Sequence, residues 1–296
     1  MLEKVLFTVD FSPFTENLLG CAEELASVGM REMVLLHVVD ANPDAVHGDR
    51  PSPDASAPEK EAGAALDSLV DKMGMIPFLV RKVVKTGNPA LQILETAKEE
   101  NVSFIFMGAH GKGFLNRLIL GSVSEKVLKL SDRPVMIQQC RVKGGAEDLV
   151  CENACSLLLQ HILIANDFSS YAEKIEPVLK EFTSTFCAPV TLLHVQESGR
   201  STYGWDANYR AEKKRTKERM RRMQDLASEL EPSCGNVRVS FVKGSPGALI
   251  PRIADEINAS LIIVGAFGNR TTGSLLGGVA EKVARESERP VLVLKA

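Results

Sequence analysis

The chain repeats itself, and this repeat constrains the fold more than any other feature of the sequence. Shifted by 157 positions, Asp10-Phe11-Ser12 falls on Asp167-Phe168-Ser169, and Leu35-Leu36-His37-Val38 falls on Leu192-Leu193-His194-Val195. A length of 296 residues suggests two domains in any case. We therefore interpret the sequence as two tandem copies of one domain.

Each copy alternates short apolar runs with amphipathic stretches. In the first copy we expect strands at 4–9, 33–39, 78–84, 103–107 and 134–138, and helices at 14–28, 59–73, 89–100 and 122–130. Apolar strands separated by helices predict a parallel sheet that is covered on both faces and joined by right-handed crossovers. The expected fold class is α/β, with two tandem doubly wound, Rossmann-like domains that each contain a five-stranded parallel sheet.

The domain boundaries follow from the extent of the two copies. We expect domains at 1–140 and 160–296, joined by a linker at 141–159. The linker begins with Lys143-Gly144-Gly145, and the stretch 147–158 after it is compatible with a short helix. Two similar domains on a short tether are expected to pack as an internal pseudo-dimer, and a homodimer is a further possibility.

Composition and charge exclude several classes of protein. A net charge of −3 gives no general attraction to nucleic acid or to anionic membranes, and no apolar stretch is long enough to span a bilayer. The N-terminus shows no signal-peptide pattern, so we expect a cytoplasmic protein. The stretch 210–222 holds eight Lys or Arg against two Glu. We interpret it as a solvated helix face, the alternative being a patch for nucleic acid or an acidic partner.

The six cysteines are unevenly divided between the copies and predict no disulfide framework. Cys151 and Cys155 lie four residues apart and could share a helix face as a metal or redox pair. No second pair with ligand spacing accompanies them, so we expect small buried side chains and no metal site.

A ligand site is expected where the strand order of a doubly wound sheet reverses. Asp10 ends the first strand, Val38 ends the second, and the fourth strand runs into the glycine-rich loop 108–113. Gly121-Ser122 then opens a helix. Glycines let the backbone approach a phosphate closely, and the free N–H groups at a helix start favour an anion.

The spacing Gly-x2-Gly-x9-Gly-Ser, given by Gly108, Gly111, Gly121 and Ser122, resembles the ATP-binding motif of universal stress proteins, and Asp10 and the second-strand LLHV match that family as well. The resemblance covers about residues 1–139 and 160–296. The resemblance implies ATP as ligand, together with Mg²⁺. It implies adenine contacts from Thr8, Val9, Asp10 and Val38. It implies phosphate and ribose contacts from Gly108, His110, Gly111, Gly121, Ser122, Val123 and Ser124.

Structural roles are open for several of these residues. Asp10 could cap the following helix, and Ser122 with Glu125 has the spacing of a capping box. His37 and His194 lie inside apolar strands, where satisfied sheet residues are more common than ligands. His110 could contact the nucleotide or only form the loop, and Lys112 could be a solvated loop residue.

The second copy departs from the motif. Gly265 and Gly268 are present, but aligning Gly277 with Gly121 leaves one residue fewer in the loop, and Gly278 stands in the place of Ser122. Phe267 also replaces His110. Because moving a helix start by one residue re-aims its N–H groups, we expect one nucleotide for each chain, in the first domain.

Three hypotheses about function remain after these observations. The leading hypothesis is a stress-response protein that binds ATP and acts as a ligand-dependent regulator or interaction module. The alternatives are a slow ATPase or nucleotidyl-transfer enzyme on the same fold, and an interaction scaffold without nucleotide. The chain has no Walker motif and no evident catalytic constellation, so no catalytic residue is predicted.

Overall fold

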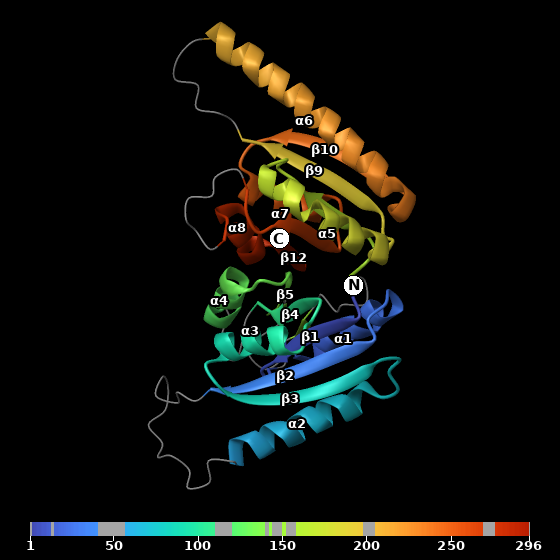
Figure 1. The fold of residues 1–296 in the computed structure, drawn as a ribbon, viewed down its shortest axis with the longest axis vertical. Helices are drawn as coiled ribbons and strands as arrows, with labels where there is room; N and C mark the ends of the chain where they lie inside the picture. Colours follow the sequence, from blue (N-terminus) through green and yellow to red (C-terminus); the bar gives the residue numbers. More distant parts are fainter. Residues whose placement is uncertain are drawn as a thin grey trace. The chain divides into compact units, whose positions relative to one another are not determined.

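The computed structural model describes residues 2–12, 15–40, 57–109, 120–139, 142–143, 150–151, 158–197, 205–268 and 276–295. Contacts divide the chain into two compact units, Met1–Leu157 and Leu158–Leu294, the last two residues aside. In both units strands and helices alternate along the chain (Figure 1). Each unit is therefore an α/β fold, as the repeat predicted.

The first unit contains a sheet whose described strands stand in the order β3-β2-β1-β4-β5 and all run parallel. Its strand order reverses at β1, which pairs with β2 on one side and β4 on the other. This is the doubly wound arrangement that the sequence predicted. Its elements are β1 (Lys4–Val9), α1 (Thr15–Ser27), β2 (Glu32–Asp40), α2 (Ala57–Met73), β3 (Leu79–Gly87), α3 (Pro89–Glu99), β4 (Phe104–Gly108), α4 (Ser122–Leu130) and β5 (Val135–Gln138).

The second unit repeats this plan, with parallel strands in the order β10-β9-β8-β11-β12. The switch point lies between β8 and β11. Its elements are β8 (Ile162–Ala165), α5 (Ser170–Phe186), β9 (Val190–Gln196), α6 (Trp205–Cys234), β10 (Val237–Lys243), α7 (Pro246–Glu256), β11 (Leu261–Gly265), α8 (Gly278–Glu286) and β12 (Val291–Leu294).

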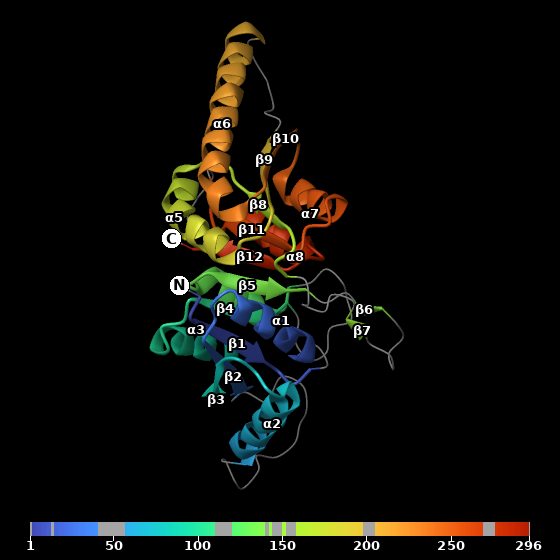
Figure 2. The same cartoon turned by 90° about the vertical axis from the view of Figure 1, so that its right-hand side faces the viewer.

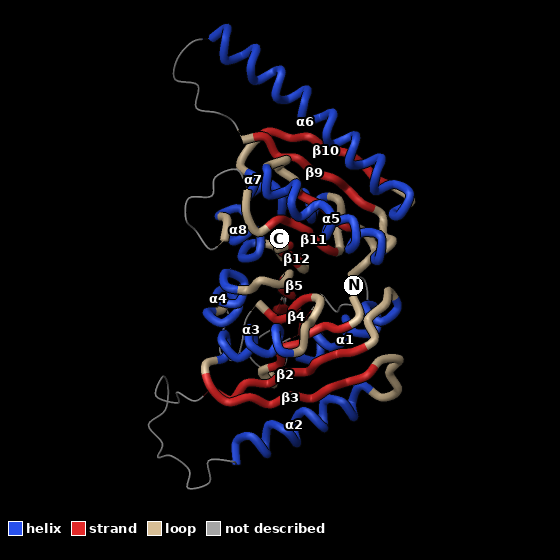
Figure 3. Tube along the Cα trace, in the orientation of Figure 1, coloured by secondary structure: helices blue, strands red, loops and turns tan. Residues whose placement is uncertain are grey.

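Helices cover both faces of each sheet. In the second unit α5 packs beside α6 and α7 packs beside α8, and Figure 2 shows these pairs on opposite faces. In the first unit α3 packs beside α4. Figure 3 shows the strands of each unit between their helices. Right-handed crossovers require this arrangement when the strand order reverses, and it leaves the carboxyl ends of the central strands open.

The core of the first unit is aromatic. Phe7, Phe104 and Phe106 have no exposed surface, and the ring centroids of Phe7 and Phe106 lie 5.0 Å apart. Burying each ring stabilises the fold by about 1.5–3 kcal/mol. All residues of β5 are buried, as expected for a parallel strand that is covered on both faces.

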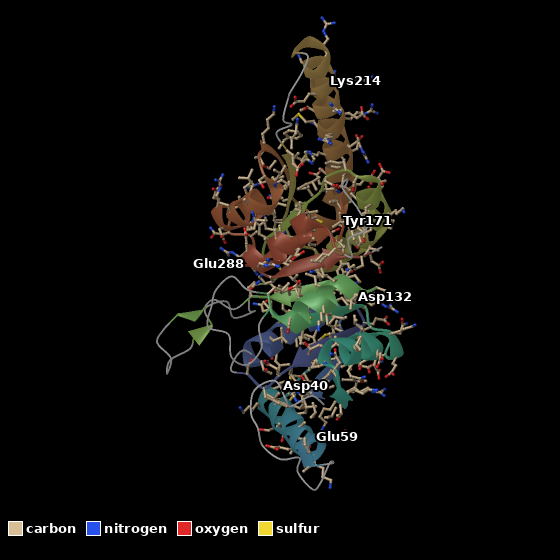
Figure 4. All side chains as sticks on the ribbon, turned by 90° about the vertical axis from the view of Figure 1, so that its left-hand side faces the viewer. Asp40, Glu59, Asp132, Tyr171, Lys214 and Glu288 are labelled. Atoms are coloured by element: carbon tan, nitrogen blue, oxygen red, sulfur yellow. The ribbon has the colours of Figure 1, made fainter. Side chains whose placement is uncertain are left out.

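The basic stretch 210–222 lies within α6, the second helix of its copy, as the sequence predicted. This helix has 30 residues, whereas α2 has 17. Of its expected apolar stripe, Met223, Leu226 and Leu230 are buried, but Met220 is 44% exposed. Lys214 and its neighbours project from the first half of α6 (Figure 4).

The expectation of a linker helix was wrong, and the cysteines include a disulfide bond that the sequence did not predict. Val150–Cys151 forms a short strand, β7, that pairs antiparallel with β6 (Val142–Lys143), so the expected linker helix is interrupted there by backbone pairing. Cys21, which is fully buried on α1, is disulfide-bonded, and its partner is not among the cysteines whose side chains the structure describes. An uneven cysteine count argues against a framework of bridges but does not exclude a single one. Cys155 lies outside the described residues.

Candidate functional site

Three neighbouring strands of the first unit end at one edge of the sheet. Val9 closes β1, Val38 lies near the end of β2, and Gly108 closes β4. Because these strands are adjacent and parallel, their carboxyl ends meet at the switch point, where doubly wound sheets bind ligands. Thr8 and Asp10 stand beside Val9, so the structure gathers the residues expected to contact adenine.

Asp10 uses one carboxylate oxygen for the fold. Its Oδ1 accepts hydrogen bonds from the Ser12 N–H at 3.0 Å and the Thr15 hydroxyl at 3.3 Å. These bonds fix the turn into α1, where Phe11 has a left-handed φ of 55°. Asp10 Oδ2 is buried and has no hydrogen-bond partner among the described residues. A buried acceptor without a partner is costly, which suggests that a ligand donates to it.

His37 and His194 have the same structural role in the two units. His37 Nδ1 lies 2.8 Å from the Val9 carbonyl oxygen, and His194 Nδ1 lies 2.7 Å from the Asn166 carbonyl oxygen. Because a carbonyl only accepts, Nδ1 carries the proton in each ring and Nε2 is an acceptor. Burial lowers the pKa of His194, and the charge of Arg219 lowers it further. His194 Nε2 has no partner among the described residues.

The start of α4 differs from the expected capping box. Gly121 is the N-cap, in extended conformation with φ −60° and ψ 149°, and α4 begins at Ser122 without a side-chain cap. The Gly121 N–H donates to the Ala109 carbonyl at 2.8 Å, and the helix begins at Ser122, as the expected range 122–130 has it. Ser122 is therefore exposed at the first turn, beside Val123.

Ser124 has a structural bond that sequence reasoning missed. Its buried hydroxyl donates to the Gly108 carbonyl oxygen at 2.8 Å and so fastens α4 to the end of β4. This bond positions the helix start against the strand ends. His110, Gly111 and Lys112, which were also singled out in the glycine loop, lie outside the described residues.

The second unit contains a cavity of about 800 Å³ at the corresponding place. This volume lies in the range of small-molecule sites. Its lining includes the counterpart of every first-copy residue to which the motif assigned a contact. These counterparts are Ala165, Asn166, Asp167, Val195, Gly265, Phe267, Gly268, Gly277, Gly278, Val279 and Ala280.

The same helix-start geometry recurs in this cavity. Gly277 is the N-cap of α8, and its N–H donates to the Ala266 carbonyl at 2.7 Å. The structure thus aligns Gly277 with Gly121. A Cβ on Gly277 would lie 3.0 Å from the Ala266 oxygen, whereas a Cβ on Gly278 would meet nothing within 4 Å. Gly278 therefore leaves open space where the first copy has Ser122.

Sequence reasoning missed a group of lining residues on α6. Glu212, Arg215 and Arg219 face this cavity, although the whole basic stretch was interpreted as solvated. Their spacing of three and four residues, which places side chains on one helix face, was the signal that could have found them.

Other classes of site were searched in the described part of the chain. It contains no group of three or more His, Cys, Asp or Glu side chains that could hold a metal ion. None of its helices combines the length and the apolarity that crossing a membrane requires.

Comparisons with known proteins place both copies in one family. A model of the universal stress protein family matches residues 1–138 and 159–295. Universal stress protein MJ0577 of Methanocaldococcus jannaschii is 29% identical over 153 residues, which are 46% of this chain and 94% of that protein. Universal stress protein YxiE of Bacillus subtilis is 32% identical over 146 residues, covering 46% of this chain and 99% of its own.

A solved structure matches both copies together. The crystal structure of a universal stress protein from Archaeoglobus fulgidus superposes with a TM-score of 0.71 at 25% identity, covering 100% of this chain and 99% of that one. The tandem arrangement therefore also occurs in a protein of known structure.

Proposed function

Because the chain belongs to the universal stress protein family, we propose that it is a cytoplasmic stress-response protein that binds ATP in its first domain. The nucleotide makes it a ligand-dependent regulator or interaction module. The observation that carries this proposal is the buried, unpartnered Oδ2 of Asp10 at the switch point of the first sheet. The proposed packing of the domains as a pseudo-dimer, and any homodimer, are separate predictions.

The residues of the first domain fit an adenine nucleotide. Asp10 Oδ2 accepts from a donor of the adenosine, while Thr8, Val9 and Val38 form the wall around the base. At the other end, the backbone N–H groups of Ser122 and Val123 stand in the first turn of α4, where the helix dipole favours phosphate. Gly108, His110, Gly111, Gly121 and Ser124 complete the proposed site.

Mg²⁺ is proposed to enter with the nucleotide. This ion prefers phosphate oxygens and water and needs few protein ligands. The described residues offer no cluster that would bind it alone. We therefore expect Mg²⁺ to strengthen ATP binding and to show no measurable affinity in the absence of nucleotide.

The first copy is the proposed ATP site because its counterpart has lost hydroxyl groups. Gly278 and Ala280 stand in the places of Ser122 and Ser124. Because the Ser124 hydroxyl is bonded to the Gly108 carbonyl, the hydroxyl that the first copy has available at the helix start is that of Ser122.

Isothermal titration calorimetry tests the proposal directly. We expect one ATP for each chain, and at 100 times the Kd a stabilisation of about 2.7 kcal/mol in one unfolding transition. Gly121→Val should abolish binding, because the new side chain occupies the phosphate space. Gly277→Val is the matched change in the second copy, because Gly277 is the N-cap of α8 as Gly121 is of α4, and it should leave ATP affinity within about threefold.

Three results would contradict the proposal. The absence of both binding heat and melting shift at millimolar ATP favours an interaction scaffold. Two equivalent sites for each chain contradict the asymmetry between the copies. Loss of binding in Gly277→Val but not in Gly121→Val assigns the nucleotide to the second domain.

A further inference from the structure

The cavity of the second unit has a wall that the first copy lacks. Under the shift of 157 positions Ala57, the first residue of α2, corresponds to Lys214, whereas α6 already begins at Trp205. Arg215 and Arg219 stand where the first copy has Pro58 and Ala62. Both positions lie within α2, so the change of residue, and not the greater length of α6, brings two guanidinium groups to the cavity.

These two arginines are uncommitted in the described part of the chain. Neither forms an ion pair or a hydrogen bond there, whereas Arg222, on the same face of α6, donates to Glu173 and stacks on the Phe168 ring at 5.4 Å. Like charges one helical turn apart repel each other. Two adjacent guanidiniums at a cavity are the arrangement that binds phosphate, sulfonate or carboxylate.

The carboxylates that line the same cavity are already engaged. Glu212 Oε1 accepts from Gln196 Nε2 at 3.0 Å and lies 3.7 Å from Lys243 Nζ. Asp167 Oδ1 accepts from the Ser169 N–H at 3.0 Å, and Glu197 also has a partner. The lining thus carries three carboxylates and two guanidiniums, and Arg215 and Arg219 are the charged side chains among its described residues that form no hydrogen bond or ion pair.

The side chains that line the cavity at the glycine loop and at the start of α8 are apolar. They are Phe267, Val279 and Ala280, and Phe267 packs edge-on against Tyr171 with ring centroids 5.0 Å apart. By sequence, the first copy has His110 and Ser122 in the places of Phe267 and Gly278. The second copy thus lacks these two side-chain donors and has Arg215 and Arg219 on α6.

One buried acceptor faces the same space. His194 lines the cavity, is 2% exposed, and has no partner for Nε2 among the described residues. Its Nδ1 is fixed by the Asn166 carbonyl, so Nε2 can only accept. An N–H or O–H on a ligand would satisfy it.

We propose that the second domain binds a small organic anion with an apolar body and a single anionic group, which Arg215 and Arg219 hold. The body lies against the apolar side chains of Phe267 and Val279, and a donor on it reaches His194. This site depends only on residues of the second domain, so it stands whether or not the first domain binds ATP.

The test uses 8-anilinonaphthalene-1-sulfonate, a fluorescent probe with an apolar body, an N–H group and one sulfonate. Titration of the full chain should show one saturable site, and saturating ATP should leave its affinity unchanged. Arg215→Gln combined with Arg219→Gln should weaken binding about 10- to 100-fold, the loss expected for charge-assisted hydrogen bonds. The probe affinity of Arg215→Lys with Arg219→Lys should lie between those of the native chain and of the glutamine variant, because lysine keeps the charge and lacks the planar guanidinium.

The matched control removes the same charge elsewhere on α6. Lys214 and Lys217 are exposed and lie outside the cavity lining, so Lys214→Gln with Lys217→Gln should leave probe affinity unchanged. Equal losses in both double variants would overturn the proposal, because they indicate general attraction to a basic helix. Unchanged affinity in the arginine variant would also overturn it. The Gly121→Val chain has its proposed first-domain ATP site blocked. If ATP displaces the probe competitively from this chain, the cavity of the second domain is a nucleotide site and the proposal is overturned.

Discussion

Asp10→Asn separates the structural role of Asp10 from its proposed ligand role. The amide oxygen of asparagine can replace Oδ1 and still accept from Ser12 N–H and the Thr15 hydroxyl. Those donors hold the amide in one orientation, which places its NH₂ group where the unpartnered Oδ2 stands. The substitution therefore exchanges an acceptor for a donor at one atom and leaves the turn intact.

The expected magnitude follows from the bond that is lost. A hydrogen bond to a charged group contributes about 1.5–3 kcal/mol, so ATP affinity should fall roughly 10- to 150-fold. Stability should change by less than about 0.5 kcal/mol, because both local bonds remain. Asp10→Ala removes these bonds as well and should destabilise the first domain by about 1 kcal/mol, the typical cost of a lost cap.

Calorimetric titration with ATP, together with urea unfolding of each variant, measures both effects. Asp167→Asn is the matched change in the second copy and should leave ATP affinity unchanged. ATP affinity in Asp10→Asn equal to that of the native chain would refute the reasoning. So would a loss of affinity that merely follows a loss of stability, because the side chain would then act only as a cap.

Three further predictions address the helix start, the buried imidazole and catalysis. Ser124→Ala should destabilise the first domain by about 1–2 kcal/mol in urea unfolding, because it leaves the Gly108 carbonyl without its donor. The pKa of His194 is lowered from 6.5 in the folded state, so below about pH 6.5 the unfolded chain binds a proton that the folded chain resists. The second domain should therefore become less stable as the pH is lowered in that range. His194→Phe should flatten the dependence of the urea midpoint on pH. Phosphate release from ATP should be far slower than the typical enzyme turnover of about 10 s⁻¹, and a rate near that value that is abolished in Asp10→Asn would favour the enzyme alternative.

The fold was predictable because the repeat and the strand pattern impose it together. Continuous apolar strands such as 4–9 and 103–107 admit few arrangements other than a parallel sheet. Each element assigned in one copy can also be checked against its counterpart in the other copy. The linker was not predictable by the same means. Val150–Cys151 has no counterpart in a second copy, and two-residue strands depend on a partner that local sequence does not reveal.

The site was predictable where it depends on the backbone and not where it depends on side-chain direction. The glycine spacing located the start of α4, yet the capping box at Ser122 failed, because the N-cap is Gly121, whose N–H donates to the Ala109 carbonyl. The arginines of α6 were missed for a related reason. Charge alone does not show which side chains of the run 210–222 reach the cavity, whereas the spacing of Glu212, Arg215 and Arg219 places them on one helix face.

The two copies show which parts of this site belong to the scaffold and which to the ligand. Phe11 and Phe168 share the same left-handed φ of 55°, and the two strand histidines donate to corresponding carbonyls, those of Val9 and Asn166. These features persist although the residues around the ligand differ, so they build the sheet edge and do not select what binds there. Selection must then lie in the residues that changed, namely the hydroxyls at the start of α4 and the guanidiniums on α6. If both proposals hold, one chain binds a nucleotide and a second, unrelated anion on the same scaffold. Its state would then depend on two concentrations instead of one.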